Sequence, residues 1–82
     1  MSRFEPYVEH SEEADCAYIY LGEGEFARTL TLDDRRMVDL ATDGSVLGIE
    51  FVDVSAGIDL SDLPHRPMIE KLIEPYGFKV FA

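Results

Sequence analysis

Residues 37–54, MVDLATDGSVLGIEFVDV, contain two apolar runs on either side of the dipeptide Asp43-Gly44. Glycine takes a positive φ at no steric cost, and Asp-Gly between two alternating runs is the strongest short-range signal for a β-hairpin. Side chains alternate between the two faces of a strand, so the second run points three apolar residues one way: Leu47, Ile49 and Phe51. We expect this face to form the floor of the hydrophobic core.

Three further strand patterns precede the hairpin. Residues 4–9 alternate weakly and contain Pro6, which cannot donate a ladder hydrogen bond, so they predict an edge strand. Residues 16–21 alternate clearly, with Tyr18 and Tyr20 facing away from the apolar set Ala17, Ile19 and Leu21. Residues 26–32 alternate again, with one apolar face made of Phe26, Leu30 and Leu32. Polar turns separate these strands at 10–15, 22–25 and 33–36.

The pattern changes after Val54. Residues 55–64 read as a loop with three apolar residues spaced to touch the domain. Residues 66–74 predict a helix that begins near Pro67, ends before Pro75 and has one apolar face of Met68, Ile69, Leu72 and Ile73. Residues 78–81 predict a short last strand. We therefore expect one α+β domain over residues 1–82, an antiparallel meander of four or five strands with the C-terminal helix on one face and the short final strand.

Composition narrows the classes of partner. The 82 residues include 17 acidic and 7 basic ones, so the net charge is −10. A field of this sign repels phosphate backbones and anionic lipids, which argues against nucleic-acid and membrane binding and suits a small basic protein. No apolar run approaches the ~20 residues of a membrane span. Cys16 is the only cysteine and the N-terminus does not resemble a signal peptide, so we expect a cytoplasmic protein.

Few arrangements in the sequence suit catalysis. Gly22-x-Gly24-x-x-Ala27 follows a strand, but another strand pattern comes after it, whereas a dinucleotide site needs a helix there. We interpret it as a hairpin loop. Cys16 follows acidic residues, which oppose formation of a thiolate, and is interpreted as a strand residue.

Polar residues give no clear metal or acid–base pattern. The densest set of possible ligands is His10, Glu12, Glu13 and Asp15, and nothing in the spacing brings the second histidine, His65, toward it. Three acidic residues lie within apolar strands, and alternation directs them to solvent: Asp39, Glu50 and Asp53. We expect no catalytic, cofactor-binding or metal-binding residue, while a functional role for His10, Glu13, Asp15, Asp39 or Glu50 stays open.

Aromatic residues are the better leads, and the candidates for a protein interface are Tyr18, Tyr20, Phe78 and Phe81. Tyrosines on the sheet face away from the core favour protein contacts. A small sheet with a helix on one face leaves its other face to water or to a partner. We expect a homodimer formed through that face or through an edge strand, against the alternative of a monomer with surface tyrosines.

Two segments carry a resemblance to a family. Residues 13–21, EADCAYIYL, resemble the opening E-A-D-A-L-Y-I-x-L of the small bacterial proteins grouped as domain of unknown function 2283. Residues 39–55, DLATDGSVLGIEFVDVS, are similar to that family's D-x-D-x-x-G-x-L-V-G-I-E-I-L-D-A-S. The chain departs from the family at His10-Ser11, where a Tyr-Asp pair is usual, and in its longer C-terminal part. The resemblance implies the fold and no catalytic residues.

Three functions remain as expectations. The first is a non-enzymatic interaction or structural module that self-associates and uses no cofactor. The second, suggested by family members that look to be encoded beside small toxin-like proteins, is an antitoxin-like partner of a small basic toxin. The third is an enzyme or ligand-binding protein, which requires a pocket that holds His10 or His65 together with carboxylates.

Overall fold

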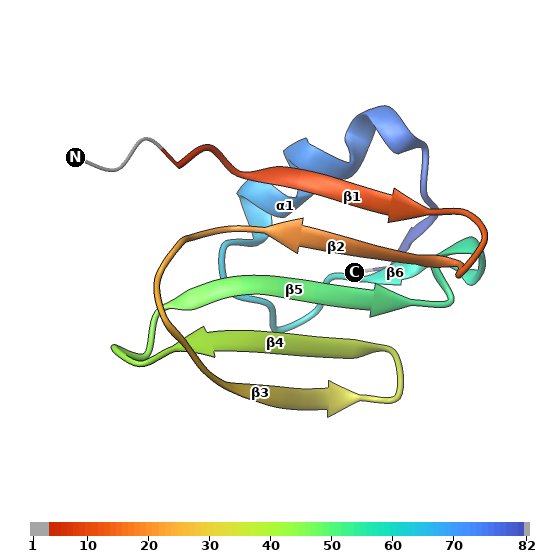
Figure 1. Cartoon of the computed structure of the whole chain (residues 1–82). Helices are drawn as coiled ribbons and strands as arrows, with labels where there is room; N and C mark the ends of the chain where they lie inside the picture. Colours follow the sequence, from red (N-terminus) through yellow and green to blue (C-terminus); the bar gives the residue numbers. More distant parts are fainter. Residues whose placement is uncertain (1–3, 82) are drawn as a thin grey trace.

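The structure, a computed structural model, describes residues 4–81 (Figure 1). The elements in chain order are β1 (Tyr7–Ser11), β2 (Cys16–Tyr20), β3 (Phe26–Asp33), β4 (Arg36–Ala41), β5 (Val46–Val52), the 3₁₀ turn η1 (Val54–Ala56), β6 (Ile58–Asp59), α1 (Arg66–Ile73), the 3₁₀ turn η2 (Glu74–Tyr76) and β7 (Val80–Phe81). The predicted α+β class is confirmed. None of the helices in the described chain is long and apolar enough to cross a membrane.

The first five strands form one antiparallel sheet in the order β1-β2-β5-β4-β3. The helix α1 lies on the far side of the sheet in this view, at the β1–β2 edge (Figure 1). The last strand, β7, does not join the sheet but pairs in parallel with β6, so Ile58 lies opposite Val80. The helix and the β6–β7 pair thus form a second layer on one face of the sheet.

The strand order differs from a simple meander. The hairpins β1–β2, β3–β4 and β4–β5 are present, but β5 and not β3 lies beside β2. Residues 21–25 therefore cross the ends of β5 and β4: the Leu21 and Gly22 N–H groups both donate to the Leu47 carbonyl (2.9 and 3.1 Å), and Thr42 N–H donates to the Glu25 carbonyl (2.9 Å). The interpretation of residues 22–27 as a hairpin loop was wrong, because β5 occupies the place beside β2.

The central hairpin is confirmed. Gly44 has a φ of 86°, and Asp43 Oδ1 accepts hydrogen bonds from the Ser45 N–H (2.9 Å) and hydroxyl (2.6 Å). One detail differs: Asp39 pairs with Gly48 and Leu40 with Val46, so Leu47 is the extra residue of a bulge. Val46, and not Leu47, packs against the core.

The core lies between the sheet and the C-terminal layer. The sheet contributes Ala17, Ile19, Val38, Ile49 and Phe51, and the other layer contributes Val54, Ile58, Leu60, Leu63, Ile69 and Ile73. The predicted contact of the 55–64 loop with the domain is confirmed. The prediction of the buried helix face was wrong at one residue, since Met68 is 44% exposed while Ile69 is fully buried. Met68 therefore lies at the edge of the apolar stripe of the helix.

The two edge strands also differ in detail from the sequence pattern. β1 is an edge strand as predicted, but it runs over Tyr7–Ser11, so Pro6 precedes it and His10 belongs to the strand. β3 is the other edge, and its eight residues are all exposed, including Phe26, Leu30 and Leu32. The second layer does not extend over β3, so it does not cover these apolar side chains.

Helix packing can be tested by a pair of truncations in α1. Ile69→Ala removes a fully buried side chain, so we expect the free energy of unfolding to fall by about 2–5 kcal/mol. Met68→Ala, in the same turn, is the matched control and should change it by less than about 0.5 kcal/mol. Urea denaturation followed by circular dichroism measures both. Equal effects of the two substitutions would contradict the packing of α1 on the sheet.

Candidate interaction surface

The face of the sheet opposite the helix carries the predicted tyrosines. Strand register arranges its residues in two adjacent rows that run across the strands: Tyr7, Tyr20, Gly48, Asp39 and Thr29 in one, and Glu9, Tyr18, Glu50, Met37 and Thr31 in the other. No helix or strand of the described residues covers this face (Figure 1). We call it the outer face.

Three tyrosine rings are in contact on the outer face. The Tyr7 and Tyr20 rings stack with centroids 4.3 Å apart, and the Tyr18 and Tyr20 rings are 4.5 Å apart and tilted. Tyr18 lies over Gly48, where an added Cβ would collide with the Tyr18 ring. Only glycine leaves room for the ring there, so the Tyr18 ring packs directly on the sheet backbone at Gly48.

Carboxylates hold the tyrosine hydroxyls. The Tyr18 hydroxyl donates to Asp39 Oδ2 (2.6 Å), the Thr29 hydroxyl donates to Asp39 Oδ1 (2.6 Å), and the Tyr20 hydroxyl donates to Glu9 Oε1. Burial, reinforced by the bond to Asp39, raises the pKa of Tyr18, and the bond to Glu9 raises the pKa of Tyr20 to about 12. Asp39 and Glu50 lie on the outward side of the sheet, as alternation predicted, but both are half-buried and not fully exposed. Asp39 accepts hydrogen bonds from two hydroxyls on other strands of the sheet.

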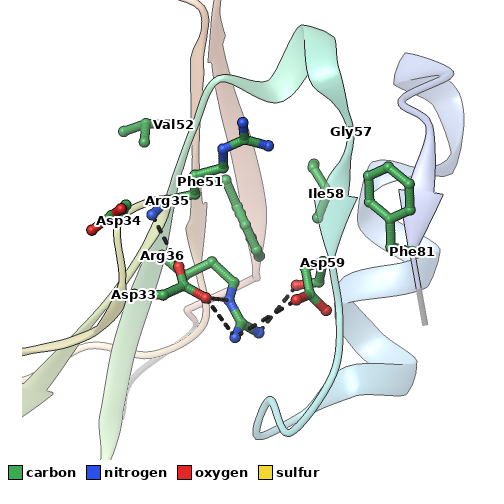
Figure 2. Close-up of a pocket in the computed structure, with 10 residues that line it drawn as sticks. All are labelled: Asp33, Asp34, Arg35, Arg36, Phe51, Val52, Gly57, Ile58, Asp59 and Phe81. Carbon is green, nitrogen blue, oxygen red and sulfur yellow. Dashed lines mark hydrogen bonds and ion pairs between the residues drawn. The ribbon is translucent and has the colours of Figure 1, made fainter.

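A second polar cluster surrounds Arg36, beside a cavity of about 310 Å³ between the β3–β4 turn and β6 (Figure 2). Arg36 is only 8% exposed. Its Nε donates to Asp33 Oδ2 (2.8 Å), and its Nη2 forms an ion pair with the same oxygen at 2.8 Å. Its Nη1 donates to the carbonyls of Ser61 (2.7 Å) and Asp59 (3.3 Å). The side chain therefore fastens the sheet to the C-terminal layer. Its donors are used within the fold.

A separate hollow, of about 330 Å³, is lined by His10 together with Glu12 and Asp15. A histidine beside carboxylates in a hollow is what the third expectation, an enzyme or ligand-binding protein, requires. The imidazole packs edge-on against the rings of Phe78 (4.8 Å) and Tyr76 (5.8 Å). Asp15 accepts from the Ser55 N–H (2.9 Å) and hydroxyl (2.7 Å), and these bonds lower its pKa. Both oxygens of the Asp15 carboxylate are thus bonded to Ser55, and these bonds join the β1–β2 turn to η1.

The remaining candidates lie apart from one another. His65 precedes α1 in a left-handed conformation and lines a different hollow, with Glu70 and Glu74. Cys16 is half-buried at the start of β2, and Glu13 is exposed in the β1–β2 turn. Among residues 4–81 no three histidine, cysteine or acidic side chains gather as a metal site would require.

The four aromatic residues predicted as an interface do not share one surface. Tyr18 and Tyr20 lie together on the outer face, whereas Phe78 is partly buried beside His10 and Phe81 lines the Arg36 cavity. Sequence reasoning missed Tyr7 and Glu9, because their places depend on the pairing of β1 with β2. It also missed Arg36, although Arg36 has the same alternation as the inward-facing Val38, which was an available signal.

The comparisons with known proteins give one match. A family model described as "Protein of unknown function (DUF2283)" matches residues 8–55, more than half of the chain. The matched segment includes nearly all of the five-stranded sheet and ends at Ser55, the residue that binds Asp15. No curated protein and no solved structure matches.

The Arg36 cluster predicts a pH-dependent contribution to stability. Hydrogen bonds from Arg36 lower the pKa of Asp33, so the contribution is present above the unfolded value of about 3.9 and is lost as the pH falls through the folded value. Asp33→Asn should cost about 1–2 kcal/mol at pH 7, since hydrogen bonds to charged groups are worth about 1.5–3 kcal/mol and the 42% exposure of Asp33 weakens them.

The measurement is the urea midpoint from pH 7 to pH 3 for the wild type, Asp33→Asn and Asp34→Asn. The difference between wild type and Asp33→Asn should narrow at the acid end. Asp34 is adjacent and exposed, so its substitution is the matched control and should leave the midpoint nearly unchanged. A constant difference at all pH values would contradict the assignment to Asp33.

Proposed function

Since the chain belongs to the DUF2283 family, whose description assigns no activity, we propose that it is a cytoplasmic, non-enzymatic interaction module that self-associates through the free edge of β3. The observation that carries the proposal is the exposure of this strand. All eight residues of β3 are exposed, and it ends the sheet on the side that the helix layer does not reach. An exposed edge strand offers unpaired backbone N–H and C=O groups to another strand.

The side chains of β3 suit a second copy. Leu30 and Leu32 are 38% and 42% exposed, and the only charged residues of the strand are Arg28 and Asp33. If two copies pair antiparallel about a two-fold axis at Leu30, Leu30 faces Leu30 and Arg28 faces Leu32. No like charges then lie opposite each other, whereas two outer faces would bring Glu9, Asp39 and Glu50 against the same three carboxylates. The edge is therefore the better dimer contact.

Sedimentation velocity tests self-association. We expect a dimer of the 9.3 kDa chain at micromolar concentration. Leu30→Lys should convert it to a monomer, because the pairing would place two like charges opposite each other. Met68→Lys changes the net charge equally at a side chain that is 44% exposed in α1, so it should stay dimeric. A wild-type protein that sediments only as a 9.3 kDa species would rule out the dimer.

A second candidate function is that of an antitoxin-like partner for a small basic toxin. The net charge of −10 and the carboxylates of the outer face favour it. Co-purification from the native host with one small basic protein, lost at high salt, is the expected result. A chain that always purifies without such a partner would count against this function and would leave self-association unaffected.

A further inference from the structure

We propose that the outer face binds an arginine-bearing segment of a basic protein, with a guanidinium stacked on the Tyr18 and Tyr20 rings and held between the carboxylates that flank them. The proposal gives a surface to the second candidate function and rests on it. It does not depend on self-association, because β3 pairs through its edge while this surface is a face of the sheet.

The geometry places aromatic rings and carboxylates side by side. Tyr18 lies directly opposite Glu9 on β1 and Glu50 on β5. Side chains directly opposite each other on neighbouring strands have Cβ atoms about 4.5–5.5 Å apart. The Tyr18 ring lies over Gly48 with its hydroxyl on Asp39, and Glu50 is its direct partner on β5, so a guanidinium placed over this ring is within reach of both carboxylates. The Tyr20 ring, 4.5 Å away and bonded to Glu9, brings the third carboxylate to the same surface. The stacked Tyr7–Tyr20 pair extends the aromatic part of that surface. Arginine is the side chain that both stacks on aromatic rings and pairs with carboxylates.

The charge of this face is not compensated within the fold. The ion pairs found among residues 4–81 use Arg35, Arg36 and Arg66, and none of them includes a carboxylate of the outer face. Arg28 has the same alternation as Leu30 and so belongs to the opposite face of β3. Lys79 lies over the ring of Phe81, in the other layer. A cationic partner would therefore meet three carboxylates with no basic side chain of the described residues between them.

The surface is also held in place before any partner arrives. The Tyr18 hydroxyl is bonded to Asp39 and the Tyr20 hydroxyl to Glu9, so each of these rings is tied to a carboxylate on another strand. Gly48 lets the Tyr18 ring lie on the sheet. A preorganised surface loses less conformational entropy on binding. Charge complementarity selects a basic segment over a second copy of this acidic chain.

The test is a titration of the full chain with a labelled, amidated hexapeptide of alternating arginine and glycine, followed by fluorescence anisotropy at low salt. Glu9→Gln/Glu50→Gln removes two charges from the outer face and keeps hydrogen-bond acceptors for Tyr20. Glu70→Gln/Glu74→Gln removes two charges from the helix layer and gives the same net charge. We expect the first pair to weaken binding roughly three- to tenfold and the second to leave it nearly unchanged.

Two further measurements sharpen the result. The same peptide with citrulline in place of arginine keeps the shape but not the charge and should not bind. Leu30→Lys should bind the arginine peptide as the wild type does, which separates this proposal from self-association. Equal weakening by both glutamate pairs would show attraction to net charge alone and overturn the proposal. Absence of binding to the wild type at low salt would also overturn it.

Discussion

The fold depends on the antiparallel pairing of β2 with β5, two strands that are far apart in the sequence. This pairing sets Ile19 beside Ile49 at the centre of the sheet, and both are fully buried. Because β5 takes the place beside β2, the chain after β2 must cross to the far edge before it returns through β3 and β4. The same pairing brings the β1–β2 turn to the end of β5, where Asp15 binds Ser55.

The outer face is a consequence of the same register. With Ile19 inward, Tyr18 and Tyr20 must point outward, and their partners across the strands are Glu50 and Gly48. One strand pairing therefore both completes the core and brings together an aromatic and acidic surface. The surface that we propose as a binding site is the reverse side of the most buried strands.

Local chemistry made much of the fold predictable from the sequence. The Asp43-Gly44 hairpin, the alternation of Cys16–Tyr20 and the helix between Pro67 and Pro75 each depend on residues close together in the chain. The strand order, the bulge at Leu47 and the exposure of β3 depend on which distant segments pair, which alternation does not encode. For the same reason Tyr18 and Tyr20 were identifiable as surface residues, whereas Tyr7 and Glu9 were not. Arg36 was missed for a different reason, because a charged side chain is rarely expected on the buried face of a strand.

The family match ends at residue 55, between the segment that forms the sheet and the segment that buries the apolar face of the sheet. Residues 8–55 carry the sheet, but the apolar side of that sheet is buried by the C-terminal segment from Ile58 to Ile73. A core accepts different apolar residues provided that the volume and pattern are kept. The sheet therefore needs a second layer to bury its apolar face, and in this protein the C-terminal segment provides that layer. Exchanges among apolar residues of this segment should therefore be tolerated as long as they keep its volume.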